Sequence, residues 1–443
     1  MAKWKLWLER HGKTAVETGK NVLIAGLLLS AILLSAKAGV IGGRDLLPEL
    51  TQMFRGTDSG SIGTLTRRDY AEAAQPLVIS VSPERGTRYG VMFSSETETV
   101  YDRFSTYLGE AVGSAGKPEV VSQKSWQTAL SGEGVFFDFV QSQDLLCVAA
   151  WLGTSAPENL AGMTAQQLFL SVEENRVLLY FTAGNGQTIY CCSTALAKSA
   201  LETRMQSYTS NQAIFAFESS QYSALEPVCL VIPGNQEIRS ISAAASAVPE
   251  NRTELLRVFG MNSVTATSYT ENDGGKVYLD GDSTLRLDAK GSVNFERSES
   301  GSKSDPGPWN GGASLPDVVD ALYQTTQRLM TNTGDAVIRL TAASYDSAAE
   351  SYTVCFGYYL DDMPICLERG YAAEYTVTSG KITRAQLRLR QYQLTGETEV
   401  SLSGPQAAAL VCADGGRKLV RVYQDNGETL SVAWRITPLW SKQ

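Results

Sequence analysis

The feature that most constrains this chain is an uncharged apolar stretch near its start. Residues 22–36 include no charged side chain, and the stretch continues past Lys37 to Ile41. At about 1.5 Å per helical residue, about twenty residues span about 30 Å, the thickness of a bilayer's hydrocarbon core. The sequence therefore predicts a single transmembrane helix over residues 21–41, with Lys37 reaching the polar interface near its far end.

The residues before this stretch indicate its orientation. Residues 1–20 contain five basic and two acidic side chains, and positively charged flanks stay in the cytoplasm. We therefore expect a cytoplasmic basic tail, a retained anchor in the cell membrane and an extracytoplasmic body. A cleaved signal peptide is the alternative, because Ala36-Lys37-Ala38 resembles a cleavage site. Both interpretations export the body.

Small residues recur four positions apart within the predicted helix. Gly26 is followed by Ser30, and Ala31 by Ser35. This spacing lets two helix backbones approach closely, so these four residues are the candidate partner-binding face in the membrane. Small residues are also frequent in any membrane helix, which is the simpler interpretation.

Charge and histidine content exclude several kinds of function. The formal net charge is −9, and the residues after 20 hold 33 basic and 45 acidic side chains, which argues against a nucleic-acid partner. The chain's one histidine, His11, lies in the basic tail. An H-E-x-x-H zinc site, a Ser-His-Asp triad and a Cys-His pair are therefore excluded from the body. We predict no catalytic, cofactor-binding or metal-binding residues, and expect that the protein is not an enzyme.

Carboxylates and cysteines leave two alternatives open. Paired carboxylates occur at predicted turns, and we interpret them as solvated turn residues. They are Glu173-Glu174, Asp280-Gly-Asp282 and Asp361-Asp362. Two carboxylates that converge only in the fold are invisible in a sequence, so a histidine-free hydrolase is the enzyme alternative. The seven cysteines lack C-x-x-C spacing, and we predict buried free thiols. A Cys355–Cys366 disulfide across a hairpin is the other reading.

The rest of the chain predicts an α+β protein with antiparallel sheets and packed helices. The expected parts are a flexible tether (42–67), an α+β domain (68–212), a middle domain (213–296), a Ser/Gly/Pro-rich linker (297–313) and a C-terminal domain (314–443). Apolar periodicity and turn residues predict particular elements within them. These are helices at 100–112, 195–208, 253–259 and 314–331, a helix or turn at 404–410, a strand at 145–152, a 177–192 hairpin, a 265–295 meander and a 419–436 hairpin.

Two groups of motifs resemble a known family. Residues 255–263, 269–275, 277–281 and 285–287 resemble the middle domain of the YycH regulators. Residues 356–365, 373–377, 380–383 and 400–410 resemble the last domain shared by YycH and YycI. One N-terminal helix followed by three external domains matches the YycH plan, whereas residues 68–212 contain no motif that matches.

The resemblance implies regulation of a sensor kinase. Members of this family are membrane-anchored accessory proteins of a Gram-positive two-component system that controls cell-wall metabolism. They associate with the sensor histidine kinase and with each other, so a YycI-like regulator is the second expected partner. Another reading is a module that binds or assembles a cell-envelope polymer without signalling.

Overall fold

The structure, a computed structural model, describes most of the chain after residue 74. The described residues are 75–184, 186–234, 237–241, 245–246, 252–298, 313–410, 417–427 and 430–436. All of them belong to one compact unit, Thr64–Gln443. The predicted basic tail, transmembrane helix and tether lie outside the described residues, as do residues 299–312 of the predicted linker. Within the described part, no helix is both long and apolar enough to cross a membrane.

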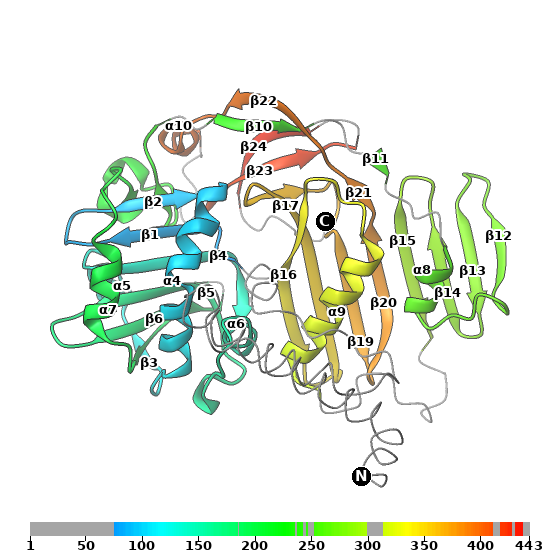
Figure 1. The fold of residues 1–443 in the computed structure, drawn as a ribbon, viewed down its shortest axis with the longest axis horizontal. Helices are drawn as coiled ribbons and strands as arrows, with labels where there is room; N and C mark the ends of the chain where they lie inside the picture. The colour runs from blue at the N-terminus through cyan, green and yellow to red at the C-terminus, as the bar shows by residue number, and fades with distance from the viewer. Residues whose placement is uncertain are drawn as a thin grey trace, which may run out of the picture. The chain divides into compact units, whose positions relative to one another are not determined.

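The first sheet has seven strands in the order β2-β1-β4-β5-β6-β7-β3 (Figure 1). Its strands are β1 (Val78–Ser82), β2 (Tyr89–Met92), β3 (Glu119–Val121), β4 (Gly134–Asp144), β5 (Thr164–Val172), β6 (Val177–Ala183) and β7 (Thr188–Ser193). Its helices are α4 (Ser95–Gly113), α5 (Gln123–Leu130), α6 (Leu145–Trp151) and α7 (Lys198–Met205). Tyr101 of α4 packs edge-on against Phe137 of β4, and Trp126 of α5 packs against Phe136. Because neighbouring strand residues point to opposite faces, α4 and α5 cover different faces of this sheet.

The second sheet has eleven strands, ten of them in the order β12-β13-β14-β15-β20-β19-β17-β18-β23-β24, and β16 pairs with β17. Its strands are β12 (Thr267–Thr270), β13 (Lys276–Asp280), β14 (Ser283–Leu287), β15 (Ser292–Arg297), β16 (Val337–Asp346), β17 (Ser351–Leu360), β18 (Met363–Cys366), β19 (Ala373–Thr378), β20 (Lys381–Arg388), β23 (Leu419–Asp425) and β24 (Leu430–Ile436). Helix α9 (Leu315–Leu329) lies along this sheet and contacts β16 and β17 (Figure 1). Pairing of β15 with β20 joins strands from the predicted middle and C-terminal segments.

Short elements connect these two sheets. Two-stranded pairs are formed by β8 (Ile214–Phe215) with β9 (Leu230–Val231), β10 (Glu237–Ile241) with β22 (Leu394–Val400), and β11 (Ala245–Ser246) with β21 (Arg390–Gln391). The remaining helices are α8 (Arg252–Val258), α10 (Gly404–Ala409) and three short 3-10 turns, Glu158–Leu160, Ala216–Glu218 and Ser220–Tyr222.

Apolar and polar contacts both hold the sheets together. Buried side chains from both sheets form one contiguous cluster that runs from Leu77 to Tyr423. Polar side chains bridge the same boundary: Lys418 pairs with Asp138, Arg421 donates to the Phe93 carbonyl at 2.9 Å, and Gln143 donates to the Thr341 carbonyl at 3.0 Å. The boundaries of the three predicted domains stay predictions.

The α+β class and most predicted elements are confirmed for the described residues. The 177–192 hairpin is β6–β7, the 265–295 meander is β12–β15, and the 419–436 hairpin is β23–β24. Helix α9 begins with the predicted cap: Ser314 accepts from the Asp317 N–H, and the Asp317 carboxylate accepts from the Ser314 N–H.

The strand predicted at residues 145–152 is wrong, because these residues form α6. Leu145, Cys147 and Val148 are all almost fully buried. A short run that is apolar on every side has no periodicity to distinguish a buried strand from a buried helix. Asp144 decides the outcome, since its carboxylate accepts from the N–H groups of Leu146 and Cys147 and caps the helix.

The cysteine prediction is confirmed for the described residues. Six cysteines are free, and five of these are buried. Cys355 and Cys366 are among them, so the disulfide alternative is wrong. In the β17–β18 hairpin Tyr358 lies opposite Ile365, a register that does not place the two cysteines opposite each other.

Candidate functional site

The residues singled out in the sequence do not form a site in the described structure. The predicted partner-binding residues Gly26, Ser30, Ala31 and Ser35 lie outside the described residues. Each of the three acidic pairs lies at a turn between paired strands, as predicted.

Asp362 is nevertheless not solvated, which corrects one of the turn predictions. Its side chain is only 3 % exposed, pairs with Arg339 at 2.5 Å and accepts from the Glu98 N–H at 3.1 Å. Asp361 also pairs, with Arg239 at 3.1 Å. This turn therefore holds the second sheet against the start of α4, a role that turn propensity alone does not reveal.

The most distinctive polar site crosses the first sheet. Asp138, Gln167, Thr182 and Ile189 lie opposite one another on β4, β5, β6 and β7. The three polar members are 1–2 % exposed. The adjacent row on the same face is aromatic. A buried polar row in an apolar sheet is costly unless its groups are hydrogen-bonded.

Hydrogen bonds connect this polar row. The Gln167 side-chain amide donates to Asp138 at 3.0 Å, and the Thr182 hydroxyl donates to the Gln167 side-chain oxygen at 3.4 Å. Lys418, which directly precedes β23 of the second sheet, donates to the other oxygen of Asp138. Lys418 and Asp138 are only 4 % and 3 % exposed, so this ion pair is buried between the two sheets.

A bulge in β4 directs the next residues toward the same place. The β4–β5 register shifts between Asp138 and Gln143, and Val140 has a positive φ of 65°. A β-branched residue adopts this conformation only under strain. Two hydrogen bonds hold it: the Val140 N–H donates to Asp138 at 2.7 Å, and its carbonyl accepts from the Gln166 side chain at 2.7 Å. Bulges of this kind re-aim side chains.

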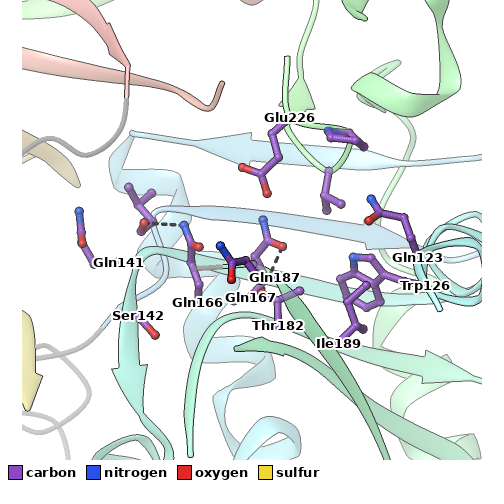
Figure 2. Close-up of a pocket in the computed structure, with 14 residues that line it drawn as sticks. Gln123, Trp126, Gln141, Ser142, Gln166, Gln167, Thr182, Gln187, Ile189 and Glu226 are labelled. Carbon is purple, nitrogen blue, oxygen red and sulfur yellow. Dashed lines mark hydrogen bonds between the residues drawn. The ribbon is translucent and has the colours of Figure 1, made fainter. Parts of the chain in front are cut away.

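The row and the bulge line a pocket of about 420 Å³. Figure 2 shows Gln123 and Trp126 at one end, Gln141 and Ser142 at the other, and Glu226 across from the sheet. The full lining is Gln123, Trp126, Val140, Gln141, Ser142, Gln166, Gln167, Thr182, Gly186, Gln187, Ile189, Glu226, Pro227 and Val228. Five glutamine side chains therefore surround one cavity.

The loop that carries Glu226 is held by the second sheet's chain. The Glu226 N–H donates to the Arg417 carbonyl at 2.9 Å, and Leu225 forms a bridge with Arg417. A small apolar cluster packs Leu225 with Cys229 and Leu419. The pocket thus has a floor on the first sheet and a loop positioned by the segment that leads into β23.

Two donor groups in the lining lack a protein partner. The Trp126 indole N–H and the Ser142 hydroxyl are buried atoms with no hydrogen bond. Trp126 itself is 1 % exposed and its ring packs against Phe169 and Tyr180. Buried polar groups are normally satisfied, so unpaired groups beside a cavity mark places where a bound molecule or water completes the bonding.

The pocket is electrostatically neutral to negative. No basic side chain lines it, and Lys418 beneath it is engaged by Asp138. Burial raises the pKa of the Glu226 carboxyl above its ordinary value; the Lys418 ammonium lowers this pKa and the Asp138 carboxylate raises it. The lining therefore disfavours anions and favours ligands that donate hydrogen bonds.

Two carboxylates lie close together at this pocket. Asp138 and Glu226 are the two carboxylates that converge here, close enough to influence each other's charge. Asp138 is buried and already accepts from Lys418, Gln167 and the Val140 N–H. Three donors therefore hold Asp138 beneath the pocket, and Glu226 is the carboxylate in the lining itself.

The chain was compared with family models, with curated proteins and with solved structures, and none of the three comparisons found a match. The YycH/YycI resemblance therefore stays a prediction.

Sequence reasoning missed this pocket, although one signal was present. Strand β4 reads as an apolar run interrupted by Gln141-Ser-Gln143, and β5 contains Gln166-Gln167. Consecutive polar residues break the pattern of a strand that is otherwise buried. That interruption marks both the bulge and the polar floor.

Proposed function

We propose that this chain is a membrane-anchored accessory regulator of a sensor histidine kinase, of the kind that serves cell-wall homeostasis in Gram-positive bacteria. It acts by binding, through its extracytoplasmic body and its transmembrane helix, and performs no catalysis. A YycI-like regulator is its second partner. The observation that carries the proposal is the N-terminal pattern, a basic tail followed by an uncharged apolar stretch, before an acidic body.

Two further features support the proposal. The motifs at residues 255–287 and 356–410 resemble YycH-type regulators, whose partners are kinases. The body also joins its two sheet regions through buried polar contacts, among them the Lys418–Asp138 ion pair and the hydrogen bond from the Glu98 N–H of α4 to Asp362.

Affinity purification from membranes tests this proposal. Tagged full-length protein should recover a histidine kinase, and Gly26→Leu with Ser30→Leu should reduce that recovery about fivefold, since close helix contacts are worth about 1–2 kcal/mol. Ala25→Leu is the control, because it places a leucine in the same helix outside the small-residue spacing. Failure to recover a kinase, together with an unchanged kinase regulon on deletion, would contradict the proposal, as would a reporter fusion that places the body in the cytoplasm.

A second candidate function is a module that binds a cell-envelope polymer without signalling. The amide-lined pocket favours it, because polar uncharged lining suits polar uncharged ligands. Sedimentation of the full-length protein with purified cell-wall sacculi separates the candidates. Two results together would favour the polymer module over the regulator. The protein would co-sediment saturably with the sacculi, and deleting it would leave kinase output in cells unchanged.

A further inference from the structure

The pocket on the first sheet carries an inference that goes beyond kinase regulation. We propose that it is a binding site for an uncharged saccharide of one or two rings. The site does not depend on the kinase proposal, since the ligand is recognised by the body's own side chains.

The first argument is the hydrogen-bonding character of the lining. Side-chain amides both donate and accept, as do the hydroxyls of Ser142 and Thr182. Saccharide hydroxyls have the same double capacity, so each can pair with an amide or with the Glu226 carboxylate in either sense. Five glutamines line the pocket: Gln123, Gln141, Gln166, Gln167 and Gln187. Gln166 and Gln167 already donate to the Val140 carbonyl and to Asp138, so the amides of Gln123, Gln141 and Gln187 supply most of this character.

The second argument is the pair of donors that the protein leaves unsatisfied. The Trp126 indole N–H belongs to a side chain that is 1 % exposed, at the end of the pocket opposite Ser142 (Figure 2). An unpaired buried donor costs about 1–3 kcal/mol, and a ligand acceptor recovers this energy once a small side-chain movement opens the donor to the cavity, because both donor atoms are closed off from solvent. Ring and hydroxyl oxygens of a sugar are such acceptors.

The third argument is charge. Glu226 is the only charged side chain in the lining, and it has no hydrogen-bonded or ionic partner within the described residues. Phosphates, carboxylates and the C-terminal ends of peptides would meet this carboxylate with no basic side chain in the lining to offset it, since the nearby Lys418 ammonium is engaged by Asp138. Neutral ligands that donate hydrogen bonds are favoured instead.

The fourth argument concerns shape and position. A volume of about 420 Å³ lies in the lower part of the range for small-molecule pockets, about 300–1,000 Å³, and suits one or two sugar rings. The cavity lies on a face of the sheet and is lined by side chains, whereas an extended peptide adds to a sheet edge through its backbone. Val140, Ile189 and Val228 form the apolar part of the lining.

Ligand-detected NMR and calorimetry on the full-length protein test the site. The protein is held in a zwitterionic detergent, because glycosidic detergents would compete. The probes are N-acetylglucosamine, its β-1,4-linked disaccharide and maltose, with alanyl-alanine and inorganic phosphate as the competing ligand classes. At least one saccharide should bind saturably below about 10 mM, a free energy of about −2.7 kcal/mol, and the dipeptide and phosphate should not.

Variants assign that binding to the pocket. Glu226→Gln removes the carboxylate with little change of shape, and Gln187→Ala truncates an exposed lining residue without disturbing the core. Each should weaken saccharide binding about fivefold, equivalent to about 1 kcal/mol. Gln206→Ala, an exposed glutamine outside the lining, is the matched control and should bind as the parent does.

Three results would overturn the proposal. They are the absence of saturable binding for all three saccharides, tighter binding of the dipeptide or phosphate, and saccharide binding that neither pocket variant changes. Thermal unfolding of each variant shows whether a loss of binding is a loss of fold. Kinase recovery from membranes is measured separately, so failure here leaves the regulatory proposal standing and the reverse also holds.

Discussion

Two buried carboxylates flank the same strand, β23, and they are used differently. Asp138 pairs with Lys418 just before the strand begins, and Asp425 pairs with Arg390 at 2.9 Å where it ends. Both carboxylates are 3 % exposed, and both accept additional hydrogen bonds. Asp138 joins two different sheets and lies beneath a pocket, whereas the partners of Asp425 are all within 35 residues of it in the sequence.

The difference lies in what surrounds each carboxylate. Asp425 accepts from Arg390, from the Tyr392 hydroxyl at 2.8 Å and from the Gly427 N–H at 2.7 Å, which closes the cluster on itself. The row that starts at Asp138 continues through Gln167 into a cavity with unpaired donors. A closed cluster fixes a strand end; an open one leaves bonding capacity that a ligand can use.

The largest expected effect comes from breaking the intersheet pair. Lys418→Met should lower the free energy of unfolding by about 3–5 kcal/mol, because it leaves Asp138 buried without its cation. Chemical denaturation of the full-length protein in detergent measures this loss. Asp138→Asn combined with Lys418→Met should recover much of it, since no unpaired charge then remains. A single-variant loss below about 1 kcal/mol would show that the pair is not buried between the sheets.

Breaking the closed cluster should cost less and leave the pocket intact. Asp425→Asn keeps the size of the side chain but removes the charge that Arg390 faces, and Arg390 is 15 % exposed and therefore partly solvated. We expect a loss of about 2–3 kcal/mol in the same denaturation experiment. Saccharide binding should be unchanged. Loss of binding by the folded variant would mean that the two carboxylates are not independent.

Local hairpins and long-range strand pairings were not equally predictable from the sequence. Hairpins and meanders with short polar turns, such as β23–β24, are local, so alternation and turn residues reveal them. The pairing of β15 with β20 joins residues about ninety positions apart, and local pattern does not specify it. At residues 145–152 the uniform apolar run left helix and strand undistinguished, and the Asp144 cap decided between them.

The candidate site was less predictable than the fold, for the same reason. Its residues come from β4, β5, β6, α5 and a distant loop, and the sequence separates Asp138 from Lys418 by 280 positions. The interrupted strand at Gln141-Ser-Gln143 is a local signal, but nothing local identifies Glu226 as a neighbour of that strand. The Asp361-Asp362 turn shows the converse. Its sequence is typical of a solvated turn, yet the Asp362 carboxylate forms a buried ion pair.

Asp144 is another buried carboxylate, and none of the groups that donate hydrogen bonds to it carries a positive charge. It therefore shows what burial does without a cation. Burial raises its pKa, and the N–H groups of Cys147 and Leu146 lower it. Asp144→Ala should cost about 1 kcal/mol through the lost helix cap, while Asp144→Asn retains a capping oxygen and should cost a few tenths. Thermal unfolding at neutral pH distinguishes the two variants. Equal losses would mean that charge at this position matters more than capping.

Glu226 should give a small effect of the opposite sign, because replacing it stabilises the fold. Its folded-state pKa is raised by burial, so its contribution to stability is fully present below the unfolded-state pKa of about 4.5 and is lost as pH rises through the folded-state value. Glu226→Gln should therefore raise the free energy of unfolding at pH 7, by about 0.5–1 kcal/mol, and this gain should disappear toward pH 4. Denaturation midpoints of parent and variant across that range measure the difference, with the exposed Glu174→Gln as control. A gain that is independent of pH would contradict the burial of this carboxylate. If Glu226→Gln both raises the free energy of unfolding at pH 7 and weakens saccharide binding, then Glu226 destabilises the fold but serves ligand binding.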